Sequence, residues 1–151
     1  MPHIINGVSC RSKIESLQHI IDQAKQGKIG PNVNKGDKLD CAYQYKSGNN
    51  CAVGSLFSEA QLKEINCSAD PWESHNEESV DALARIFGKN NIEAVTGMAI
   101  AELVTIQRVH DKALEGAYSL LAQQQADKAE KAVSAVIDTA TMMLKMAQAK
   151  V

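Results

Sequence analysis

Hydrophobic side chains recur at helical spacing in the first part of the chain. The stripe consists of Ile14, Leu17, Ile20, Ile21 and Ala24, which step by one or three residues and share one helical face. Ser12 and Glu15 have the spacing of a capping box just before it, and Gly27 can adopt the left-handed conformation that ends a helix. We therefore expect an amphipathic helix over residues 12–26.

A period of two follows in residues 39–46, "LDCAYQYK". Its first, third, fifth and seventh positions are Leu39, Cys41, Tyr43 and Tyr45, which is the pattern of a half-buried strand. The next four residues, "SGNN", favour a turn because Gly and Asn tolerate positive φ. The apolar segment 51–57, "CAVGSLF", returns either as a second strand or as a tight helical turn. The pattern predicts a small β-hairpin near residues 39–54.

Two short helices are expected next. Ser58 and Gln61 form a second capping box, which predicts a helix over residues 59–66. After a polar connector, a helical face is formed by Val80, Leu83, Ile86 and Phe87. Gly88 is placed to end that helix.

From Asn91 onward the pattern is helical almost to the end of the chain, and Gly116 is the best break. The first stripe comprises Ile92, Val95, Ala99, Leu103, Ile106 and Val109, and the second comprises Ala126, Ala129, Val133, Val136, Ala140, Met143 and Ala147. A continuous helix over 117–149 would be about 50 Å long, which exceeds a domain of this size. It therefore either bends back on the core or projects and pairs with another copy, and we favour self-association.

These elements define a mainly α (α+β) fold. We expect a helical domain with one small β-hairpin over residues 1–116 and a long C-terminal helix over 117–151 that serves as an oligomerisation element. A chain of 151 residues can bury roughly 70% of its unfolded surface, so it needs neither metal nor disulfide to fold.

The net charge of −2 argues against a dedicated DNA or RNA binder, which carries a basic excess. The charge is unevenly distributed, with seven Lys/Arg and four Asp/Glu in residues 1–57 but three and eight in residues 58–93. The basic N-terminal third can attract a small anion or an acidic partner.

Neither a membrane span nor a signal peptide is expected, because no run of 18 apolar residues occurs and the first residues lack an apolar core. We expect a reducing cytoplasm and therefore free thiols at Cys10, Cys41, Cys51 and Cys67. Their spacing fits no zinc template, so neither a metal nor another cofactor is expected.

Residues 27–38, "GKIGPNVNKGDK", have the composition of a loop. Glycine amides and lysine charges together can cradle a phosphate, although the spacing is not that of a P-loop. A plain solvated loop has the same composition. An anion-binding loop and a solvated loop therefore both remain open.

Cys51 and His110 are the strongest catalytic candidates. A thiol that precedes a helical turn can act as a nucleophile, and a histidine about 60 residues later can act as its base. Adjacent helical residues point about 100° apart, so we do not expect Asp111 to orient the His110 ring. Cysteine is also a common small core residue. We expect no enzymatic activity, with a Cys51–His110 hydrolase as the alternative.

Two segments resemble a group of small, mostly uncharacterised bacteriophage and prophage proteins. The first is "CAYQYKSGNNCAVGSLFSEAQL", with the pattern C-x-Y…G-x-x-C-A-V-G, and the second is "LVTIQRVHD", with the pattern I-Q-x-x-H-D. The resemblance covers residues 40–115 and carries no activity that could be transferred. It implies a phage origin and a role during infection.

We therefore expect a non-catalytic, phage-type binding protein in the host cytoplasm. It would counter a host defence by sequestering a small anionic, nucleotide-type signal or by inhibiting a host protein. Positive charge, aromatic faces and turn polarity mark the candidate ligand contacts as Lys28, Lys35, Lys38, Tyr43, Tyr45 and Asn49. A structural oligomer is a further alternative.

Overall fold

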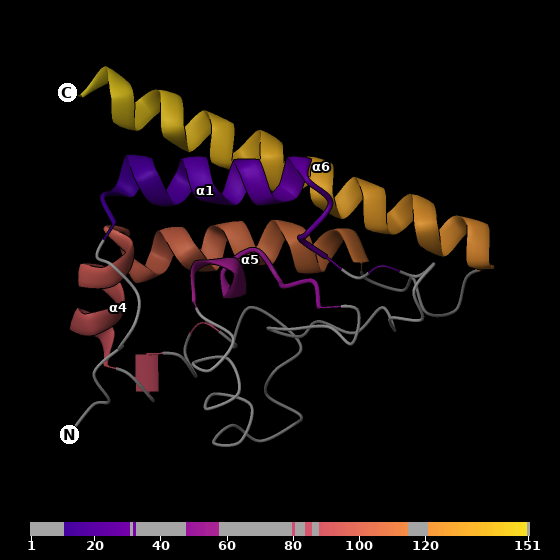
Figure 1. The fold of residues 1–151 in the computed structure, drawn as a ribbon, viewed down its shortest axis with the longest axis horizontal. Helices are drawn as coiled ribbons and strands as arrows, with labels where there is room; N and C mark the ends of the chain where they lie inside the picture. Colours follow the sequence, from indigo (N-terminus) through magenta and orange to yellow (C-terminus); the bar gives the residue numbers. More distant parts are fainter. Residues whose placement is uncertain are drawn as a thin grey trace.

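The computed structural model describes residues 11–30, 32, 48–57, 80, 84–85, 88–114 and 121–150, and all structural statements concern these residues. Three long helices dominate: α1 (Lys13–Lys25), α5 (Ile100–Leu114) and α6 (Ala122–Ala149). They run side by side, with α6 packed along both α1 and α5, and the short helix α4 (Lys89–Thr96) lies at one end (Figure 1). The described fold is mainly helical, as the sequence predicts.

Helix α1 follows the predicted pattern closely. The Glu15 N–H donates to Ser12 Oγ and the Ser12 N–H donates to Glu15 Oε1, both at 3.1 Å, so the capping box is complete. At the other end Gly27 has φ +73°, and the N–H groups of Gly27 and Lys28 donate to the carbonyls of Ala24 and Gln23. This is a Schellman motif, which satisfies carbonyls that the helix itself leaves open. The predicted bounds of 12–26 are confirmed to within one residue.

The predicted continuous helix from Asn91 is wrong, because the chain breaks at Gly97. Gly97 has φ +67° and donates its N–H to the Glu93 carbonyl at 2.8 Å, which ends α4. A Cβ at this position would lie 2.5 Å from the backbone nitrogen of Lys13. The break lets the α4–α5 corner approach the start of α1, while Ile92 and Leu103 on either side of it remain in one core.

Helix α6 folds back on the other helices. Its buried positions are Ala129, Ala132, Val136, Ala140 and Leu144, and the last three belong to the same core cluster as Leu17 and Ile20 of α1. A stripe rich in alanine allows α6 to approach α1 and α5 closely along its length. In the described residues no helix is long and apolar enough to cross a membrane.

The second arm of the predicted hairpin is not a strand. Residues 51–57 contain the 3₁₀ helix η2 (Gly54–Leu56), and Asn50 forms an isolated parallel bridge with Ile29 instead of pairing with a preceding strand. All seven residues of 51–57 are buried. The segment satisfies several of its backbone groups by local turns, such as the Leu56 N–H donating to the Val53 carbonyl. The predicted first arm, 39–46, and the predicted helix 59–66 lie outside the described residues.

A buried polar cluster as the candidate functional site

The predicted ligand contacts fall mostly outside the described part. Lys35, Lys38, Tyr43 and Tyr45 are outside it, whereas Lys28 is exposed at the end of α1. The Asn49 side chain forms hydrogen bonds within the chain. Its Nδ2 donates to the carbonyls of Gly27 at 3.2 Å and Gly30 at 3.0 Å. Asn49 thereby ties the 48–50 turn to the end of α1.

The backbone amides at the start of the 27–38 loop are used within the chain. The N–H groups of Gly27 and Lys28 close the Schellman motif, and the Gly30 N–H donates to the Asn50 carbonyl at 2.9 Å. Phosphate cradles depend on N–H groups that point at the ligand. In residues 27–30 these three amides therefore do not form one.

Cys51 is a buried thiol. Its side chain is 1% exposed and its Sγ accepts a hydrogen bond from the Gly54 N–H at 3.2 Å. Burial raises the pKa of the thiol to about 12, and the nearby Asp111 charge acts in the same direction, while the Gly54 bond opposes both. Cys51 is therefore protonated at neutral pH and is a poor nucleophile in this state.

His110 and Asp111 form a pair that the sequence argument did not anticipate. His110 is fully buried, and its Nδ1 lies 3.1 Å from Asp111 Oδ1. The expectation that Asp111 could not orient the ring is wrong. Nδ1 is the ring nitrogen nearest the backbone and the Asp side chain is short, so the two reach each other despite the 100° between their Cβ directions.

Gln107 connects this pair to the segment that carries Cys51. The Val53 N–H donates to Gln107 Oε1 at 3.3 Å, and Gln107 Nε2 donates to Asp111 Oδ1 at 2.9 Å. A backbone N–H can only donate, so it fixes which end of the Gln107 amide faces Asp111. Residues 51–57 and α5 therefore lie against each other.

Three buried polar atoms lack a hydrogen-bond partner among the described residues. They are Asn50 Oδ1, His110 Nε2 and Asp111 Oδ2. An unsatisfied buried polar atom costs about 1–3 kcal/mol, so each requires an explanation. We call Gln107, His110 and Asp111 the His110 cluster.

The cluster is not an assembled catalytic dyad. Because His110 Nε2 has no partner among the described residues, no hydrogen bond joins it to Cys51 Sγ. Where the structure describes the chain, no group of three His, Cys, Asp or Glu residues could hold a metal ion. The arrangement can hold a fixed imidazole tautomer, but it does not activate the thiol.

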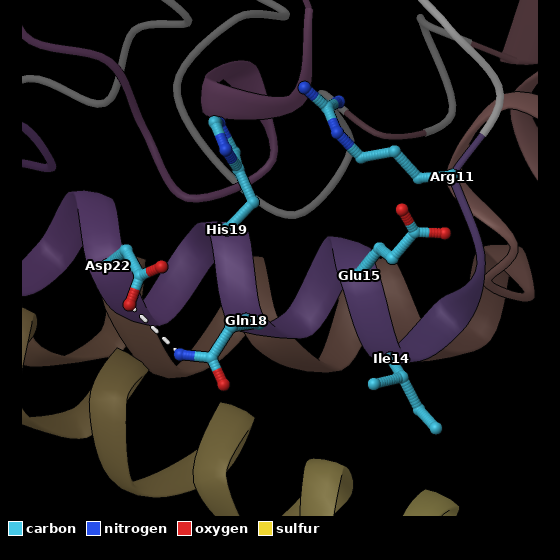
Figure 2. Close-up of a pocket in the computed structure, with 6 residues that line it drawn as sticks. All are labelled: Arg11, Ile14, Glu15, Gln18, His19 and Asp22. Atoms are coloured by element: carbon cyan, nitrogen blue, oxygen red, sulfur yellow. Dashed lines mark hydrogen bonds between the residues drawn. The ribbon is translucent and has the colours of Figure 1, made fainter.

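A shallow groove of about 410 Å³ lies on the outer face of α1. Arg11, Glu15 and His19 extend toward η2 in Figure 2, whereas Ile14 points the other way. Arg11 Nη1 donates to the Leu56 carbonyl at 3.1 Å, and His19 Nε2 lies 2.9 Å from the Ser55 carbonyl. The groove side chains thus hold η2 against α1, and their basic groups are already engaged.

Sequence reasoning missed Gln107, Asn50 and the role of Asp111. One clue was present, because Gln107 and Asp111 are four residues apart, a spacing that places them on one helical face. The parallel bridge between Asn50 and Ile29 is a further contact that no local pattern indicates.

Comparisons with family models, curated proteins and solved structures find no match to this chain. Function must therefore be argued from the geometry of the chain itself.

Proposed function

We propose that this chain is a non-catalytic, phage-type binding protein that acts in the cytoplasm of the infected cell. It would counter a host defence by inhibiting a host protein or by sequestering a nucleotide-type signal. The observation that carries the proposal is the state of Cys51, whose buried thiol has a pKa raised to about 12 and makes no hydrogen bond to His110 among the described residues. The phage context is supported only by the sequence resemblance.

Two observations favour a protein partner over a small anion. Lys28 follows the C-terminus of α1, where the helix dipole is negative and disfavours an anion. Helix α6 exposes Met142 and Met146, which are 59% and 58% exposed and lie one turn apart on one face. Exposed methionines suit an adaptable protein contact.

Thermal unfolding with a panel of nucleotides, together with affinity capture from host lysate, tests this proposal. A ligand at a hundred times its Kd stabilises by about 2.7 kcal/mol, which corresponds to a rise in melting temperature of roughly 5–11 °C for a chain of this size. A rise that Lys28→Glu abolishes and Lys145→Glu preserves supports the signal-binding form. Capture of one host protein that is lost on Met142→Glu/Met146→Glu supports the inhibitor form, and failure of both assays refutes the proposal.

A cysteine-dependent hydrolase is a second candidate, favoured by one observation. The 3.1 Å contact between His110 Nδ1 and Asp111 Oδ1 is the one that orients a catalytic histidine. This function requires a rearrangement that exposes Cys51 and brings Sγ to Nε2. The assay measures how well the protein protects a phage from the host defence. Protection that is lost with Cys51→Ser but kept with Met142→Glu would favour the hydrolase, whereas full protection by Cys51→Ser excludes it.

A further inference from the structure

Helix α6 carries three methionines within five residues, "MMLKM" at positions 142–146, and they lie in two different environments. Met142 and Met146 are 59% and 58% exposed, and their spacing of four residues places them on one face of the helix. Met143 is half-buried and packs against the core cluster that contains Leu144. Met98, next to the α4–α5 break, is 1% exposed. The fold therefore separates two solvent-facing thioethers from two that pack in or against the core.

Exposure decides which of these sulfur atoms a dissolved oxidant can reach. With hydrogen peroxide, a sulfur lone pair attacks one peroxide oxygen, so an S–O bond forms while the O–O bond breaks. The hydroxide that leaves takes the hydroxyl proton of the sulfur-bound oxygen and becomes water. The thioether is oxidised by two electrons to a sulfoxide, and the peroxide is reduced to water. Met142 and Met146 are open to this reaction, whereas Met98 is shielded from it.

Oxidation at the two exposed positions changes the surface of α6 and leaves its core contacts in place. A sulfoxide is polar, so it disrupts a methionine that is packed in a core or an interface. The core side of this part of α6 is formed by Met143 and Leu144, and neither Met142 nor Met146 belongs to the core cluster or packs against it. An oxidised protein should therefore keep its fold and lose only the apolar character of the exposed face.

We propose that Met142 and Met146 form an oxidation-sensitive switch, in which peroxide converts both thioethers to sulfoxides and releases the host protein bound to this face. The inference rests on the inhibitor form of the proposed function. A bound partner would have to desolvate two sulfoxide oxygens in place of two apolar contacts. The loss of one buried apolar side chain corresponds to roughly tenfold or more in Kd. Methionine sulfoxide reductases reverse the reaction, so the release is reversible.

The first test measures oxidation in the full chain without any partner. The protein is treated briefly with hydrogen peroxide, catalase removes the excess, and fragment mass spectrometry follows the gain of one oxygen atom at each methionine. Met142 and Met146 should be oxidised about tenfold or more faster than Met98, with Met143 slower than both. The melting temperature should be unchanged. Equal rates at all four positions, or a clear fall in melting temperature, would overturn the proposal.

The second test measures capture of the host protein before and after oxidation. Only the purified protein is treated, so the lysate never meets peroxide. Capture should fall about tenfold or more after oxidation and return after treatment with methionine sulfoxide reductase. A Met142→Leu/Met146→Leu variant keeps the volume and apolar character of both side chains without an oxidisable sulfur. It should capture the partner equally well before and after peroxide, whereas Met143→Leu, the matched control, should lose capture as the unmodified chain does.

The outcomes separate this inference from the function on which it rests. Capture that persists although both exposed methionines are fully oxidised overturns the switch and leaves the inhibitor form intact. Loss of capture in the peroxide-treated Met142→Leu/Met146→Leu variant also overturns it, because this variant retains all four cysteines and the loss would then come from their thiols. An untreated protein that captures no host protein refutes the inhibitor form and the switch together. If the double leucine variant itself fails to capture, recovery of the oxidised natural sequence by the reductase decides.

Discussion

The protonation state of Cys51 leads to the most decisive prediction. At pH 8 an ordinary thiol with a pKa of 9.0 is about one-tenth ionised, whereas a thiol with a pKa of about 12 is ionised to about one part in 10⁴. Only the thiolate reacts with iodoacetamide. The native protein should therefore be alkylated at Cys51 about a thousandfold more slowly than an ordinary thiol, and more slowly still because the side chain is only 1% exposed.

Peptide mass spectrometry resolves this rate from those of the other three cysteines. The internal reference is a Ser134→Cys variant, because Ser134 is exposed on α6 in the same folded protein. The same reaction in concentrated urea should bring both thiols to similar rates. If Cys51 in the native protein is alkylated at a rate within tenfold of that of the reference thiol, Cys51 is not a buried, protonated thiol. The hydrolase would then be the favoured function.

The remaining predictions concern stability and assembly. Gly97→Ala should lower the free energy of unfolding by roughly 2–5 kcal/mol, the sum of left-handed strain and overpacking against the backbone of α1. Gly27→Ala should lower it by only about 1–2 kcal/mol in the same urea titration, and equal effects would contradict the close contact. Light scattering should show an oligomer that Met142→Glu/Met146→Glu converts to a monomer, in which case a host partner must displace the second copy from this face; an unchanged mass would contradict assembly through it. The pKa of Glu102 is lowered overall. Partial burial raises it, but the Lys13 ammonium and the Ala99 N–H stabilise the carboxylate and outweigh burial. Its stabilisation should be complete above its ordinary pKa of 4.5 and be lost as the pH falls through the lower folded value, so Glu102→Gln should flatten the acid side of a stability–pH curve.

Local chemistry explains which parts of the fold the sequence predicts. The start and end of α1 follow from Ser12, Glu15 and Gly27, whose capping hydrogen bonds are all to neighbours in the chain. Gly97 was not recognised as a break because the apolar stripe continues across it. Its decisive contact, with the backbone of Lys13, is distant in sequence.

The candidate site was predicted only in part, for the same reason. Cys51 and His110 were identified as residue types, but the 3₁₀ turn that buries Cys51 depends on packing against α5 and α1. Asp111 reaches the ring despite the 100° between the two Cβ directions, because Nδ1 lies close to the backbone. Contacts between distant segments, such as Gly30 with His110, follow from no periodicity.

The position of α6 across both α1 and α5 has a consequence for synthesis. The Ser16 hydroxyl donates to the Thr96 carbonyl across 80 residues of chain, and the α6 residues that complete the core come later still. The apolar face of α1 therefore cannot be fully covered until α6, which follows it in the chain, has been translated. Until then Leu17 and Ile20 lack the α6 side chains that complete their core, so α1 reaches its final packing only after α6 has been made.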